Sequence, residues 1–161
     1  MKQQRTIKQD LAEIVTFVEF SLKADTLSPA QVTQSLGIIP SRVYAKGEQY
    51  ASKAFDTETK RPVPRIGTHP WGLWAVETKD MVLSTNVEDH AIFLLNILEP
   101  KVEQIQAYLE RSNEYSVRFY VEWITRGGEG GYDLSGTTLA RMSRLCHYVQ
   151  FAFLHTGRVK V

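Results

Sequence analysis

The chain has 161 residues, of which 43% are hydrophobic and 23% are charged, a balance that suits a globular domain and excludes a largely disordered protein. The formal net charge of +1 does not indicate attraction of the whole molecule to DNA or to an anionic membrane. The one cysteine, Cys146, cannot close an intramolecular disulfide, which favours a cytoplasmic location.

Neither a membrane segment nor a signal peptide is expected. The longest strongly apolar stretch, residues 91–98, is far too short to cross a bilayer. Residues 1–10 are polar and lack the apolar region of a signal peptide. The expected organisation is a polar tail at 1–13, a single domain at 14–155 with a long loop at 47–70, and a basic tail at 156–161.

The first expected elements are a strand, a helix and a second strand. Apolar and polar side chains alternate along residues 15–23, which is typical of a strand with one buried face. Residues 28–36 form a predicted helix, with Ser28 as its cap and Gly37 as the left-handed residue that ends it. Residues 41–46 follow as a short strand.

Residues 47–70 are the least regular stretch of the sequence. They contain Pro62, Pro64 and Pro70 and show no sustained apolar period. A loop of this length is unusual inside a domain and is often functional. Two interpretations stay open, an ordered functional loop and a flexible insertion.

Three more strands and a long helical region complete the predicted elements. Thr85 and Glu88 have the spacing of a capping box at the start of a helix. Pro100 interrupts this helix and predicts either a kink or a second helix that starts there. Ser135 is the expected cap of the last helix. The predicted elements are a strand at 71–78, helical residues 85–111, a strand at 115–124, a helix at 135–145 and a strand at 149–153.

The order of these elements predicts an α+β fold. The first six match a ferredoxin-like βαββαβ run, which the final helix and strand extend. Strands that alternate between apolar and polar residues have only one buried face. We therefore expect a mostly antiparallel sheet with the helices on one face.

Three segments in a fixed order resemble a bacterial family of small proteins, domain of unknown function 4279. The segments are Leu27-Ser28-Pro29 through Tyr44-Ala45-Lys46-Gly47-Glu48, Gly72-Leu73-Trp74 with the helix that contains Leu98-Glu99-Pro100, and Leu134-Ser135 with its helix and closing aromatic strand. The resemblance covers roughly residues 14–154 and implies a compact α+β domain of bacterial origin. The family supplies no established catalytic residues.

The candidate binding residues lie at the two ends of the long loop and on one strand. Lys46 and Glu48 begin the loop, and Trp71 and Trp74 follow it. Tryptophan is a frequent anchor of binding surfaces, although Trp74 has an alternative place in the core. Arg65 and His69 are the candidates within the loop, and Arg118, Tyr120 and Glu122 are the candidates that share the polar face of strand 115–124.

The residues that carry common enzyme chemistry are not arranged for it. The four histidines lack the spacing of metal ligands, and no G-x-S-x-G motif is present. Cys146 sits at the end of a predicted helix, where a core role is more common than nucleophilic catalysis. No cofactor, metal or catalytic residue is predicted.

Three hypotheses for function follow. The first is a non-enzymatic cytoplasmic module that binds another protein, for example a toxin that it neutralises. The second is a small-molecule or nucleotide binder with a pocket under the 47–70 loop. The third is a homodimer formed through exposed strand edges. Nucleic-acid binding is not favoured, because the basic loop lacks the aromatic residues of known RNA-binding modules.

Overall fold

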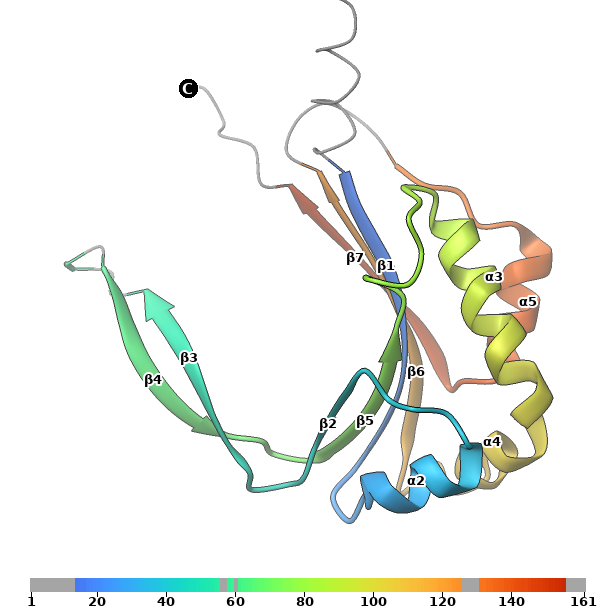
Figure 1. Cartoon of the computed structure of the whole chain (residues 1–161), viewed down its shortest axis with the longest axis horizontal. Coiled ribbons are helices and arrows are strands. Elements are labelled where there is room, and N and C mark those ends of the chain that lie inside the picture. Colours follow the sequence, from blue (N-terminus) through green and yellow to red (C-terminus); the bar gives the residue numbers. More distant parts are fainter. Residues whose placement is uncertain (1–13, 56–57, 60, 126–130, 156–161) are drawn as a thin grey trace, which may run out of the picture.

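Five strands form one sheet in a computed structural model that describes residues 14–55, 58–59, 61–125 and 131–155 (Figure 1). The strand order is β2-β5-β1-β6-β7. Neighbours are antiparallel except β6 and β7, which are parallel. The strands are β1 (Ile14–Ala24), β2 (Arg42–Tyr44), β5 (Gly72–Glu77), β6 (Ser116–Thr125) and β7 (Tyr148–His155). The two predicted tails, 1–13 and 156–161, lie outside the described residues.

The described helices all pack on one face of this sheet (Figure 1). They are α2 (Pro29–Leu36), α3 (Val87–Leu98), the 3-10 turn η1 (Glu99–Lys101), α4 (Val102–Leu109) and α5 (Gly136–Ser143). This arrangement confirms the predicted α+β class, the mostly antiparallel sheet and the single helical layer. The predicted ferredoxin-like arrangement remains a prediction, because two further strands interrupt the βαββαβ run.

The core lies between the sheet and the helices. Along β6, Val117, Phe119, Val121 and Trp123 are buried, and the residues between them are half-buried on the opposite face. A buried side chain of this size contributes about 1.5–3 kcal/mol to stability. The alternation that predicted the strand therefore reflects one covered face and one open face.

The helix ends differ in detail from the prediction. Asn86, rather than Thr85, caps α3 by accepting a hydrogen bond from the Glu88 N–H at 3.1 Å. Pro100 lies in the 3-10 turn η1 that separates α3 from α4, which agrees with a second helix beginning near this proline. Ser135 caps α5 as predicted, but the Ser28 side chain makes no capping bond.

The predicted loop at 47–70 is instead an antiparallel hairpin of β3 (Gln49–Phe55) and β4 (Pro62–Thr68). Among the described strands these two pair only with each other, so neither face is buried against a core and no apolar alternation is needed. Pro62 and Pro64 are two residues apart and fall on the same side of β4. An edge strand tolerates prolines there because no neighbour needs their missing N–H.

Candidate functional site

A β-bulge sets the direction of the β3–β4 hairpin. Gly47 has a left-handed φ of 83°, and its N–H donates to the His69 carbonyl at 2.8 Å, while the His69 N–H donates to the Glu48 carbonyl at 2.9 Å. Gly47 and Glu48 thus both oppose His69, with glycine first, as in a G1 bulge. Four residues separate the flanking pairs on each strand, so the register is the same on both sides. Such a bulge bends the ribbon, and we call this segment the elbow.

Three rings pack at the elbow. His69 stacks on Tyr44 with 3.5 Å between ring centroids, and its ring lies 4.6 Å from that of Tyr50. The Tyr50 ring also lies across Gly67, where an added Cβ would approach it to 2.6 Å. These contacts join the inner side of the hairpin to β2 of the sheet.

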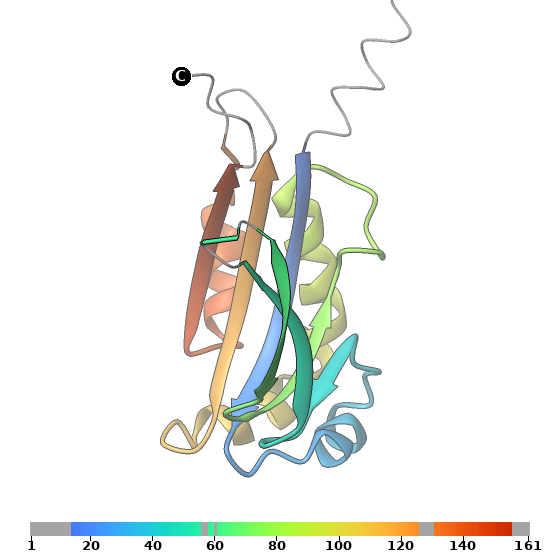
Figure 2. The ribbon, with the colours of Figure 1, turned by 90° about the vertical axis from the view of Figure 1, so that its left-hand side faces the viewer.

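The hairpin curves round to the sheet face that no described helix covers, and Figure 2 shows it in front of that face. We call this the open face. Its side chains alternate with those of the core, and the strand register places them side by side. They include Glu19, Ser21, Lys23, Arg42, Tyr44, Ser116, Arg118, Tyr120, Glu122, Tyr148 and Gln150.

A buried carboxylate organises the positive charge of the open face. Glu19 is only 2% exposed and forms ion pairs with Arg42 and with Arg118, whose Nη2 lies 3.6 Å from Oε1. Arg118 also donates to the Ser21 hydroxyl at 3.2 Å and to Gln150 at 2.7 Å. The geometry explains how a charge can lie in the middle of a sheet, since buried charges need partners.

Lys23 adds a third cation beside this pair of arginines. Burial lowers the pKa of Lys23 below its ordinary value, and the nearby Arg118 lowers it further, while Glu19 acts in the opposite direction. The ammonium lies 5.2 Å from the centre of the Trp71 ring. Glu77, opposite Glu19 on β5, and Glu122 on β6 lie on the same face, so three carboxylates accompany the three cations of the open face.

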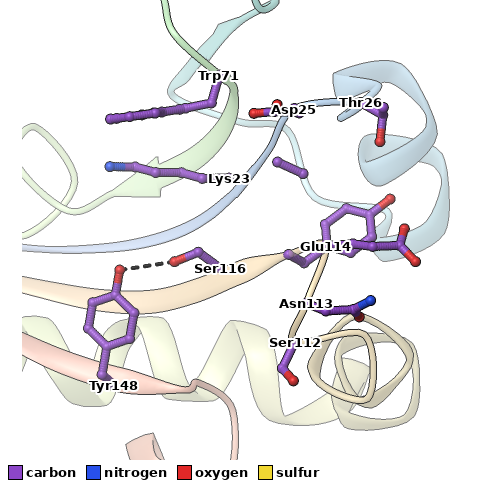
Figure 3. A pocket seen from close by; sticks show the side chains of 11 residues that line it. Lys23, Asp25, Thr26, Trp71, Ser112, Asn113, Glu114, Ser116 and Tyr148 are labelled. Carbon is purple, nitrogen blue, oxygen red and sulfur yellow. Dashed lines mark hydrogen bonds between the residues drawn. The ribbon is translucent and has the colours of Figure 1, made fainter.

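A pocket of about 700 Å³ lies at the edge of the open face where β1 and β6 meet their connecting loops. Figure 3 shows Trp71 above Lys23 on one side of the pocket, and the hydrogen bond between Ser116 and Tyr148 on the other. Glu114 and its neighbours in the loop before β6 close the remaining side. The pocket is open to solvent and contains both apolar and polar groups.

The structure brings most of the predicted binding residues to this side of the molecule. Arg118 and Tyr120 lie on the open face as described. Glu122 follows them on β6 with a half-buried side chain. His69 lies at the elbow, and Arg65 is exposed on β4 of the hairpin.

The predicted residues that flank the long loop have different environments. Trp71 is 40% exposed and lines the pocket. Trp74 is fully buried in the core, where its indole N–H donates to Thr33 at 3.0 Å, so it cannot line a surface. Lys46 pairs with Asp25 at 2.5 Å on the surface. Glu48 accepts a hydrogen bond from the Ala45 N–H and serves the turn at the elbow.

Sequence reasoning missed Glu19, Lys23 and Arg42 as members of the site. The alternation in residues 15–23 does place Glu19 and Lys23 on the polar face of their strand. The alternation does not show how β1 pairs with β6, and this pairing sets Glu19 opposite Tyr120 and Lys23 opposite Ser116. A buried acid among polar residues of a central strand is the signal that could have found the cluster.

The described residues offer no metal site, and Cys146 is buried. No group of three or more His, Cys, Asp and Glu side chains is placed to hold a metal ion in the part of the chain that the structure describes. Burial raises the pKa of the Cys146 thiol to about 11, which keeps it protonated at neutral pH.

Comparison with known proteins identifies a family without an assigned function. A family model described as Domain of unknown function (DUF4279) matches residues 13–152. No curated protein and no solved structure matches the chain. None of the described helices combines the length and the apolar character that crossing a membrane would require.

Proposed function

The chain belongs to the DUF4279 family, and we propose that it is a non-enzymatic binding module that holds a partner protein on its open face, beside the β3–β4 hairpin. The observation that carries the proposal is the gathering of cationic and aromatic side chains on the one sheet face that no described helix covers. Arginine, tyrosine and tryptophan are the residues that most often dominate binding energy at protein interfaces.

The hairpin supports this proposal. An isolated two-stranded hairpin is marginally stable in water, yet this one extends from the sheet and is joined to it at the elbow. Its contact through Tyr50, His69 and Tyr44 directs its inner side toward the open face. A partner segment on the open face would contact both surfaces and would stabilise the hairpin.

The proposal includes the setting in which the module works. A bacterial cytoplasm suits a chain with one buried cysteine, because thiols stay reduced there. An immunity protein that neutralises a toxin is one kind of module that works by binding alone. In this proposal the protein has no substrate, and its activity is the occupation of a partner surface.

The experiment is an affinity pull-down with a shortened hairpin. The pairs Tyr44↔Leu73 and Gln49↔Thr68 are each five residues apart along both strands, so the register is the same on both sides of the elbow. Replacing residues 50–67 by Asn-Gly would close the ribbon with a two-residue turn. The core is not touched, so the melting temperature should change little.

The tagged wild-type protein should capture a stoichiometric partner from a lysate of its own organism, and the shortened protein should not. A matched pair of charge reversals locates the surface: Arg65→Glu on the hairpin should weaken capture, and Arg144→Glu after helix α5 should not. A partner that the shortened protein retains would show that the hairpin and the open face are not the binding surface.

A second candidate function is the binding of a small molecule, which the pocket of about 700 Å³ beside Trp71 favours. A ligand that binds only the folded protein raises the melting temperature by mass action. A thermal-shift screen with nucleotides, sugars and organic acids tests this function. No shift with any compound would leave the partner protein as the remaining candidate.

A further inference from the structure

The charges that line the pocket do not balance. Its charged residues are Lys23, Asp25 and Glu114. Asp25 is paired with Lys46, and Glu114 is paired with Arg111. Lys23 forms neither an ion pair nor a hydrogen bond with any other described side chain. Each carboxylate is thus neutralised by a cation outside the lining, while Lys23 has only the nearby charge of Glu19, which already pairs with Arg42 and Arg118.

The surroundings of Lys23 make this charge unusual for a solvated lysine. The side chain is half-buried, and the two neighbouring cations, Arg42 and Arg118, share the single carboxylate of Glu19. The ammonium faces the Trp71 ring rather than an acceptor. An incoming anion would supply the acceptor that Lys23 lacks and would relieve the repulsion among the three cations.

The other walls of the pocket define what the anion is attached to. Trp71 and Tyr115 provide aromatic surface. The hydroxyl groups of Ser116 and Tyr148 lie 2.9 Å apart and can turn to donate to a bound oxygen. Lys23 is the one cation among the charged residues of the lining, which suits the single charge of a carboxylate better than the double charge of a phosphate.

We propose that the Lys23 pocket binds a carboxylate that is carried on an apolar or aromatic group. The inference deepens the proposed function, on which it rests, because the pocket adjoins the open face and shares Lys23 with it. The carboxylate comes either from an acidic or C-terminal residue of the partner protein or from a free organic acid. The chemistry of recognition is the same for both sources.

In the test, each of two probes is added stepwise to the protein, and the protein's amide NMR signals are recorded at each step. The probes, N-acetyl-phenylalanine and N-acetyl-phenylalaninamide, differ only in charge. The acid should shift the signals of Lys23, Ser116 and the Trp71 indole, and should bind about tenfold more tightly than the amide, as expected when an ionised group accepts a hydrogen bond in a half-buried site. Equal binding of the two probes, or no binding at millimolar concentration, would overturn the inference.

Two substitutions separate the charge of Lys23 from its role in the fold. Lys23→Met should abolish the preference for the acid, and Lys23→Arg should restore it, while the remaining amide signals of both variants stay in place. A preference that survives in Lys23→Met would assign the anion to another cation and would overturn the inference.

The source of the carboxylate is read from the pull-down. Loss of the captured partner with Lys23→Met assigns the carboxylate to the partner, and retention assigns it to a free acid. The two proposals also fail separately. If the shortened hairpin retains the partner but the acid probe binds, the proposed surface is wrong and the pocket stands. If capture needs the hairpin but the acid and the amide bind equally well, the carboxylate pocket is wrong and the proposed binding surface stands.

Discussion

Replacing Arg118 by Met should lower the free energy of unfolding by about 2–3 kcal/mol. The substitution keeps the aliphatic part of the side chain but removes one of the two cations that neutralise Glu19. It also removes the hydrogen bonds to Ser21 and Gln150. Because Glu19 is 2% exposed, water cannot replace the lost partner.

The magnitude follows from the geometry of the pair. At the observed 3.6 Å, two unit charges interact by about 4–5 kcal/mol at an effective dielectric constant of about 20. Part of this energy is offset by the cost of removing Arg118 from water, since its side chain is only 15% exposed. Arg42 still binds the other carboxylate oxygen in the variant, which further limits the loss.

A double-mutant cycle measures the pair itself. Urea unfolding is recorded for the wild type, Arg118→Met, Glu19→Gln and the double variant, and the coupling energy should be about 2 kcal/mol. The coupling should change little with salt because the carboxylate is buried. A coupling below about 0.5 kcal/mol, the usual scatter of additive mutations, would refute the view that this ion pair organises the open face.

Three further predictions concern the elbow, the thiol and one carboxylate. Gly67→Ala should displace the Tyr50 ring, because the new Cβ would lie 2.6 Å from it; hydrogen exchange should become faster in β3 and β4 and stay unchanged in the core. Cys146 should react with iodoacetamide at pH 8 far more slowly in the folded than in the unfolded protein, because burial raises its pKa to about 11. Burial alone would raise the pKa of Glu88, but hydrogen bonds from Thr138 and from Ser135, the cap of α5, lower it on balance. Its ionised form therefore stabilises the fold above pH 4.5, and the deficit of Glu88→Gln, measured by urea unfolding, should shrink as the pH falls below that value.

The elements that could be predicted from the sequence are those that touch the core. Strand β6 alternates because one of its faces is buried, and α5 begins at Ser135 because the hydroxyl satisfies a free N–H. The β3–β4 hairpin could not be found in this way, because a ribbon without a buried face leaves no apolar period. Gly47 is the one local signal of the elbow, since its left-handed backbone permits the bulge.

The candidate site was predicted only in part for a related reason. Alternation showed that Arg118 and Tyr120 share a face, but it could not show which strands lie on either side of them. Glu19 and Arg42 join the cluster through pairings between residues far apart in the chain. Trp74 was predicted as a surface candidate but lies in the core. Its position next to a loop does not show which face of the sheet it occupies until the register is known.

The shared register on the two sides of the elbow makes the length of the hairpin independent of the rest of the fold. Strand side chains alternate with a period of two, so adding two residues to each arm would lengthen it by about 7 Å and keep the same side chains facing inward. Adding one residue to each arm at the elbow would turn the inner side outward. The reach of the hairpin can therefore change in steps of two residues without any change in the core.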